Sequence, residues 1–233
     1  MSKTALVIMA RYPEPGKTKT RLGRTIGNDR AAALYQAFLT DLAHRFVGQP
    51  YHLHWAYTPS EANFHDFIAT LAPSQYMTCF PQQGADLAAR LHHAFKETRK
   101  RGFEQTILIG SDSPHISLAT IYNAYKALDR ADVVLGPADD GGYYLIAMRH
   151  PHDLFTGIPM STSRVCEMTI DLAHRQELLV YLLQPLLDVD ELPNLLRLAE
   201  LLQEDPTLAP ATATHLRKEL AQKTVILSGA KNP

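Results

Sequence analysis

Aspartate residues that could bind a metal ion occur in two short segments of the chain. Asp112 lies within residues 110–114 (Gly-Ser-Asp-Ser-Pro), and Asp188 and Asp190 are two positions apart. A carboxylate at the end of a strand can bind Mg²⁺ or Mn²⁺ that bridges phosphate oxygens, and carboxylates at i and i+2 can share one cation. Aspartates of this kind also serve as turn residues or helix caps, and Asp190 precedes a helical pattern. Spacing alone leaves both interpretations open.

A third acidic segment contains glycine. Asp140 is followed by Gly141 and Gly142, and paired glycines let a backbone approach a ligand closely. The alternative for the same letters is an Asp-Gly hairpin turn. The pattern does not choose between the two.

The segment from Arg11 to Gly27 is rich in basic residues and follows an apolar run of strand length. Gly16 permits a tight turn after two prolines. Backbone N–H groups and cationic side chains here could neutralise a polyphosphate, whereas a solvated basic loop is the simpler alternative on charge alone. A P-loop is excluded, because the position five residues before Gly16-Lys17 must be glycine and is Arg11. The basic side chains are those of Arg11, Lys17, Lys19, Arg21 and Arg24.

Several other chemistries lack support. The two cysteines match neither a disulfide framework nor a zinc spacing, and none of the 11 histidines forms a His-Glu-x-x-His pattern. Ser111 and Ser113 lack the Gly-x-Ser-x-Gly context of a hydrolase nucleophile. Asp86 and Arg90, at i and i+4, predict a helix-surface pair worth about 0.2–0.5 kcal/mol.

Composition indicates an ordinary globular protein. The chain has 233 residues, 45% of them hydrophobic and 20% charged, with a formal net charge of −1. This balance argues against nucleic acid as the main ligand, and no apolar stretch is long enough to span a bilayer or form a signal-peptide core. We expect a cytoplasmic protein with one domain over residues 1–205 and a C-terminal helix and tail over 206–233.

Hydrophobic periodicity predicts which elements position these residues. Strands are expected at 5–10, 52–57, 76–80, 106–109, 132–135, 143–148 and 179–183. Helices are expected at 28–46, 61–71, 85–99, 118–128, 191–202 and 214–222. This alternation predicts an α/β fold with a mainly parallel, twisted sheet and helices on both faces, in which ligands bind at the carboxyl ends of the strands. The polar segments after residues 10, 109 and 135 should therefore meet at one edge.

Taken together, the motifs resemble a bacterial family of the glycosyltransferase-A (GT-A) superfamily, some members of which are named arsenosugar-biosynthesis glycosyltransferases. The resemblance runs in order from about residue 4 to residue 200. This chain has Met160 where the family often has tryptophan, and Glu191-Leu192 where Thr-Pro usually follows the Asp-x-Asp pair. The matching segments are 11–22 (RYPEPGKTKTRL), 83–91 (QGADLAARL), 110–114 (GSDSP), 135–144 (LGPADDGGYY), 157–162 (GIPMST) and 188–190 (DVD).

The resemblance implies a Rossmann-like GT-A, or nucleotide-diphospho-sugar transferase, fold with Mg²⁺ or Mn²⁺ as cofactor. Asp112 would be the chief metal ligand, with Asp188 or Asp190 as a second acidic position. The remaining roles would be divided between a nucleotide side and a sugar or acceptor side. The nucleotide and its phosphates would be bound by Arg11, Gly16, Lys19 and Arg21, with Asp86 and Arg90 contacting the nucleotide or bracing its loop. The sugar or acceptor side would comprise Asp140, Gly141, Gly142, Ser161 and Thr162.

The leading hypothesis is a metal-dependent glycosyltransferase that uses a nucleotide-sugar donor and a small-molecule acceptor, with Asp140 as general base if the reaction inverts configuration. A nucleotidyltransferase that couples an NTP to a phosphorylated acceptor would need the same basic loop and metal carboxylate. The two reactions differ in their product, a nucleoside diphosphate or pyrophosphate. A nucleotide-binding regulatory protein without catalysis is a third alternative.

Overall fold

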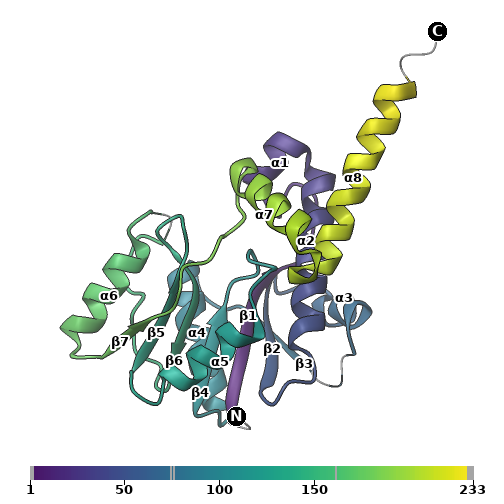
Figure 1. Ribbon diagram of the computed structural model, residues 1–233. Coiled ribbons are helices and arrows are strands. Elements are labelled where there is room, and N and C mark those ends of the chain that lie inside the picture. The colour runs from purple at the N-terminus through teal and green to yellow at the C-terminus, as the bar shows by residue number, and fades with distance from the viewer. Residues whose placement is uncertain (1–2, 74, 76, 161, 230–233) are drawn as a thin grey trace.

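A seven-stranded sheet forms the centre of the computed structural model, which describes residues 3–73, 75, 77–160 and 162–229 (Figure 1). The strand order is β3-β2-β1-β4-β6-β5-β7. The strands are β1 (Thr4–Arg11), β2 (His52–Thr58), β3 (Met77–Pro81), β4 (Gln105–Ile109), β5 (Val133–Pro137), β6 (Tyr143–Met148) and β7 (Val180–Leu182). Each lies within a few residues of its predicted position.

The sheet is mainly parallel, as the sequence predicted. β1 pairs in parallel with β2 and β4, β2 with β3, and β5 with β7. β6 alone among the named strands runs antiparallel, to both β4 and β5. The connection from Pro137 to Tyr143 explains this, because a parallel crossover needs a dozen or more residues and this one is far shorter.

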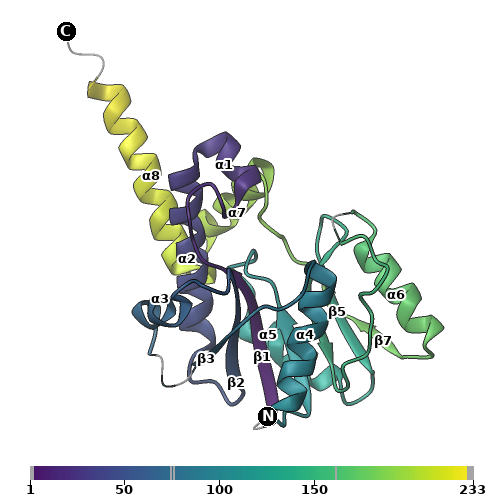
Figure 2. The ribbon, with the colours of Figure 1, turned by 180° about the vertical axis from the view of Figure 1, so that it is seen from behind.

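Helices cover both faces of the sheet. One face packs α2 (Asn28–Phe46), α3 (Phe64–Leu71), α5 (Leu118–Ala127) and α7 (Leu192–Glu204) around one apolar core. The other carries α4 (Leu87–Lys100) and α6 (Val165–Arg175) around a second core, as Figure 2 shows from behind. β1 divides its side chains between them: Leu6 and Ile8 enter the first core, Ala5 and Val7 the second. Its continuous apolar run therefore reflects burial on both faces.

The structure differs from the sequence interpretation at two helices. Helix α1 (Thr20–Ile26) occupies part of the segment for which a solvated loop was the simpler interpretation, and α2 follows it from Asn28 with Gly27 as its N-cap. α7 is capped by Glu191 in a capping box with Asn194, which leaves the carboxylate of Asp190 free for other contacts.

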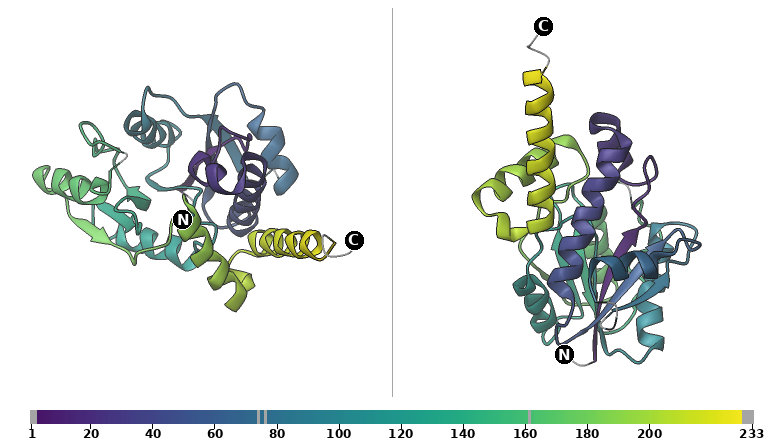
Figure 3. Two further views of the ribbon diagram at one scale, coloured as in Figure 1. Left: turned by 90° about the horizontal axis from the view of Figure 1, so that it is seen from above. Right: turned by 90° about the vertical axis from the view of Figure 1, so that its right-hand side faces the viewer.

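The last helix, α8 (Pro210–Gly229), is fixed to α2 at its first turn. The buried carboxylate of Asp41 accepts hydrogen bonds from the N–H groups of Ala211 at 2.7 Å and Thr212 at 2.9 Å. The helix then extends past α1 and away from the sheet (Figures 1 and 3). Within the described part of the chain, no helix combines the length and apolarity needed to cross a membrane.

Candidate active site at the carboxyl edge of the sheet

A cleft of about 650 Å³ opens at the carboxyl ends of β1 and β4, where the polar segments were expected to meet. It is lined by side chains from the basic segment, the two aspartate segments and the glycine-containing turn. The sequence-predicted site residues that line it are Arg11, Lys19, Arg21, Arg90, Asp112, Asp140, Gly142, Thr162, Asp188 and Asp190.

The other predicted site residues do not line this cleft. Gly16 has a positive φ of 75° and forms the turn of the basic segment. Asp86 is the N-cap of α4 and accepts a hydrogen bond from the N–H of Ala89 at 2.8 Å. Its expected pairing with Arg90 is replaced by this cap. Gly141 packs against the backbone of Ser163 and is not among the lining residues, and Ser161 is outside the described residues.

The carboxylates of Asp112, Asp188 and Asp190 come together. They approach from the end of β4 and from the segment between β7 and α7, and one oxygen of each lies within 4.8 Å of the others. Backbone contacts hold the two segments together: the N–H of Val189 donates to the carbonyl oxygen of Asp112 at 3.1 Å. These three carboxylates are referred to below as the acidic triad.

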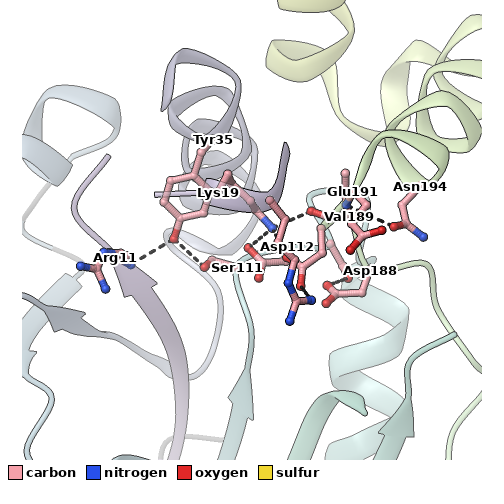
Figure 4. A network of polar contacts seen from close by, with 12 residues as sticks. Arg11, Lys19, Tyr35, Ser111, Asp112, Asp188, Val189, Glu191 and Asn194 are labelled. Carbon is pink, nitrogen blue, oxygen red and sulfur yellow. Dashed lines mark hydrogen bonds and ion pairs between the residues drawn. The ribbon is translucent and has the colours of Figure 1, made fainter. Parts of the chain in front are cut away.

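The ammonium group of Lys19 lies against the acidic triad (Figure 4). Its Nζ is 2.7 Å from Asp112 Oδ1 and 3.0 Å from Asp190 Oδ1, and it donates to the carbonyl oxygen of Val189 at 2.6 Å. The side chain is only 4% exposed, and its backbone lies in the left-handed region at φ 49°. Non-glycine residues seldom adopt this conformation, and such strain tends to occur at functional sites.

The pKa values of the triad and of Lys19 are shifted by burial and by the negative charge of the three carboxylates. Burial and the neighbouring carboxylate of Asp112 raise the pKa of Asp188 to about 7. Burial also raises the pKa of Asp112, and the nearby ammonium of Lys19 opposes that shift. For Lys19, burial lowers the pKa, but the three carboxylates outweigh it and the net shift is upward. The cluster therefore favours a bound positive charge beyond the one that Lys19 supplies.

Tyr35 positions the ends of the two central strands and was not identified from the sequence. Its hydroxyl accepts a hydrogen bond from the N–H of Arg11 at 3.0 Å and pairs with Ser111 Oγ at 2.7 Å (Figure 4). Burial raises its pKa to about 12. Tyr35 lies within the helix predicted at 28–46, next to its apolar face. A tyrosine at such a position is expected to be buried and to need a hydrogen-bond partner for its hydroxyl, and this expectation was the signal that could have identified it.

Ser113 was considered only as a hydrolase nucleophile, and the structure gives it another task. Its hydroxyl lies 2.8 Å from the carbonyl oxygen of Leu187 and donates to it, and Asp188 Oδ1 is 3.2 Å away. It therefore fixes the segment that carries Asp188 and Asp190 to the end of β4. No sequence pattern indicates this contact, because its partners are more than 70 residues away.

Three arginines give the cleft its cationic side. Arg11, at the end of β1, has a buried Nε without a hydrogen-bond partner among the described residues. Arg21, whose side chain is 58% exposed, lies 3.5 Å from Asp190. Arg90 donates from Nε to the carbonyl oxygen of Gly84 at 3.2 Å, which braces the start of α4. An anion in the cleft would satisfy the unpaired donor of Arg11.

The turn between β5 and β6 lines the cleft on the other side of β4 from β1, whose end carries Arg11. Asp140 Oδ1 accepts a hydrogen bond from the N–H of Gly142 at 2.8 Å, which is the turn geometry that was one of the two sequence interpretations. The carboxylate is exposed and lines the cleft as well. The turn is therefore present, and the approach of a ligand to the paired glycines stays a prediction.

Known proteins resemble this chain in sequence and in structure. A family model described as "Uncharacterized protein conserved in bacteria (DUF2064)" matches residues 48–162. The crystal structure of a protein from Desulfovibrio desulfuricans G20, assigned as a nucleotide-diphospho-sugar transferase, is 35% identical with a TM-score of 0.86. The match covers 95% of this chain and 96% of that one. A search of curated proteins gave no significant match.

More distant structures share the fold. A cytidylyltransferase of Leptospira borgpetersenii is 13% identical with a TM-score of 0.54, over 90% of this chain and 97% of that one. A 4-diphosphocytidyl-2C-methyl-D-erythritol synthase of Anaerococcus prevotii is 8% identical with a TM-score of 0.56, over 87% and 100%. With a 35% identical relative matched along nearly its full length, the chain belongs to the GT-A-like nucleotide-diphospho-sugar transferase family.

Proposed function

We propose that this transferase is metal-dependent and transfers a sugar from a nucleotide-sugar donor to a small-molecule acceptor. The observation that carries the proposal is the acidic triad in a cleft that is also lined by three arginines. The diphosphate of a nucleotide sugar carries negative charge that a bridging cation and cationic side chains can together neutralise.

The triad fits Mg²⁺ or Mn²⁺. Its donor atoms are carboxylate oxygens, which these hard cations prefer, and a spacing within 4.8 Å allows one ion to contact all three residues. Asp112, Asp188 and Asp190 would hold the ion. When bound, it neutralises charge that builds on the departing diphosphate.

The chain's own residues supply the remaining binding energy. Arg11 offers an unpaired buried Nε, and Arg21 and Arg90 line the same cleft. One guanidinium group can donate two parallel hydrogen bonds to phosphate oxygens, and it keeps its positive charge at any physiological pH. We assign to these arginines the diphosphate of the donor, with Tyr35 holding the backbone of Arg11 in place.

Asp140 is our candidate for general base. Its carboxylate is exposed to the cleft on the wall opposite the arginines, where an acceptor hydroxyl would approach the donor sugar. In an inverting reaction it would remove the hydroxyl proton during attack on the sugar carbon. Its hydrogen bond from the N–H of Gly142 fixes the orientation of the carboxylate.

Thermal unfolding with Mn²⁺ and a panel of NTPs and nucleotide sugars tests the proposal. A ligand at 100 times its Kd adds about 2.7 kcal/mol to the free energy of unfolding, or about 5–10 °C in Tm for a domain of this size. We expect a metal-dependent shift with one nucleotide sugar for the wild type, and none for Asp112→Asn. Asp139→Asn is the matched control, because Asp139 pairs with Arg197 and does not line the cleft.

The product of the reaction separates the alternatives. Release of a nucleoside diphosphate supports sugar transfer, whereas release of pyrophosphate would make the protein a nucleotidyltransferase. Nucleotide binding without turnover of any donor would favour a regulatory protein. If no nucleotide shifts the Tm of the wild type, with or without Mn²⁺, the assignment of the acidic triad and the arginines is wrong.

A further inference from the structure

We propose that the acceptor of this enzyme carries hydroxyl groups but no phosphate or carboxylate. This inference rests on the proposed function, which assigns the arginine side of the cleft to the donor diphosphate. It concerns the part of the cleft beyond β4, referred to below as the acceptor wall, which is formed by residues 138, 140, 142–145, 160, 162–163 and 165.

Charge divides the cleft into two sides. All of the cations among its described lining residues come from the first 90 residues of the chain, namely Arg11, Lys19, Arg21 and Arg90. The charged member of the acceptor wall is an acid, Asp140. An anionic acceptor on this wall would face a carboxylate rather than a counter-ion.

Arg164, which lies within the segment of the acceptor wall, and Arg197, which reaches the neighbouring Asp139, are both paired with acids. Arg164 contacts Glu167 at 2.9 Å, and Arg197 contacts Asp139 at 2.8 Å. Neither residue lines the cleft. Lys19 is likewise occupied, because its buried ammonium contacts two carboxylates and a backbone carbonyl.

The described side chains of the acceptor wall suit a neutral polyol. Thr162 and Ser163 carry hydroxyl groups, of which that of Thr162 donates to the carbonyl oxygen of Pro159 at 3.1 Å and can still accept, and Asp140 has an exposed carboxylate that can accept hydrogen bonds from hydroxyls. Tyr143 and Met160 add apolar surface of the kind that packs against the C–H groups of a sugar ring. Sites built from a few polar groups on an apolar surface recognise small uncharged molecules.

The first experiment asks whether the cleft holds a second anion. The protein is saturated with Mn²⁺ and the nucleoside diphosphate of its donor, and the Tm is then followed during titration with inorganic phosphate or glycerol 3-phosphate. We expect no further rise for the wild type. Thr162→Lys, which places a cation on the acceptor wall, should gain a rise and so shows that the assay detects such binding. A rise for the wild type as large as that of Thr162→Lys overturns the proposal.

The second experiment compares acceptors that differ only in a phosphate. Release of the nucleoside diphosphate is measured with glycerol against glycerol 3-phosphate, and with glucose against glucose 6-phosphate. We expect the parent compound to accelerate release more than its ester, and a preference for the esters would overturn the proposal. Failure of the proposed function itself appears earlier, as the absence of any Tm shift with nucleotide and Mn²⁺.

Discussion

The ammonium of Lys19 lies 2.7 Å from a carboxylate oxygen of Asp112, within the cluster of acids that we assign to a divalent cation. It offsets one of three negative charges and joins the basic segment to the segment that carries Asp188 and Asp190. Lys19 is therefore a built-in counter-ion of the triad. It also opposes the entry of a metal ion, because like charges repel within a partly buried site.

Replacing Lys19 by methionine should separate these two effects. Without metal, Lys19→Met is expected to lose about 1–3 kcal/mol of stability, because a nearly buried ion pair is broken while Asp112 retains some solvent. With Mn²⁺, the variant should gain more stability than the wild type, because the triad then has a larger unmet charge. Thermal unfolding with and without Mn²⁺ measures the first effect, and calorimetric titration of Mn²⁺ measures the second.

Lys17→Met is the control for this experiment. Lys17 belongs to the same basic segment, but its side chain is 61% exposed and pairs with Glu14 at 2.9 Å rather than with the triad. It should leave both the Tm and the Mn²⁺ affinity close to their wild-type values. Our interpretation of Lys19 fails if Lys19→Met binds Mn²⁺ no more tightly than the wild type does.

The fold could be predicted because its signals are local. The apolar run of β1 and the helical face of Leu34, Phe38 and Leu42 in α2 depend only on neighbours in the chain, and both elements are found where expected. The antiparallel direction of β6 and the helix α1 were less accessible. The direction of β6 depends on the length of a turn, and α1 lies in a segment whose composition resembles a loop.

The site was predictable in its members but not in its pairings. Asp112, Asp188 and Asp190 were identified as metal-ligand candidates, and the structure brings the three together. Their contact with Lys19 joins positions more than 90 residues apart, so no spacing rule can reveal it. A cationic side chain in a basic segment predicts anion binding, yet the anion here is a carboxylate of the same chain.

Gly141 should tolerate no side chain, because the backbone beside it leaves no space. It has a φ of +87°, and a Cβ atom built on it would lie 1.9 Å from the carbonyl oxygen of Ser163. Gly141→Ala would therefore force the turn of Asp140 away from the loop that carries Ser163. We expect the free energy of unfolding of this variant, measured with urea, to fall by about 1–2 kcal/mol because alanine must adopt a left-handed backbone conformation. The steric conflict should lower it by about 1–3 kcal/mol more.

Gly157→Ala isolates the backbone contribution. Gly157 has a similar φ of +81°, but nothing lies within 4 Å of a Cβ atom built there. It should lose only the left-handed penalty, about 1–2 kcal/mol. Equal losses for the two variants would show that the loop of Ser163 moves freely and that the acceptor wall is not fixed by Gly141.

His54, on β2, is a buried titratable group far from the cleft lining. Its Nδ1 pairs with the hydroxyl of Thr78, and the ring of Phe103 lies 4.9 Å from its own. Burial, with a further contribution from the charges of Arg101 and His52 and against the opposing charge of Glu97, lowers its pKa to about 4. The histidine is therefore neutral in the folded protein near pH 7.

Acidification should destabilise the protein through this residue. The unfolded chain takes up the proton near pH 6.5 and the folded chain only near pH 4, so the free energy of unfolding falls as the pH drops through that range. Between the two pKa values the slope of the free energy of unfolding approaches about 1.4 kcal/mol per pH unit. Above pH 6.5 the contribution of His54 to that free energy is constant. Urea unfolding across this range should give a shallower dependence for His54→Gln, whereas His65→Gln, at an exposed site, should match the wild type. An unchanged slope in His54→Gln would mean that His54 is protonated in the folded protein and that its charge is compensated there.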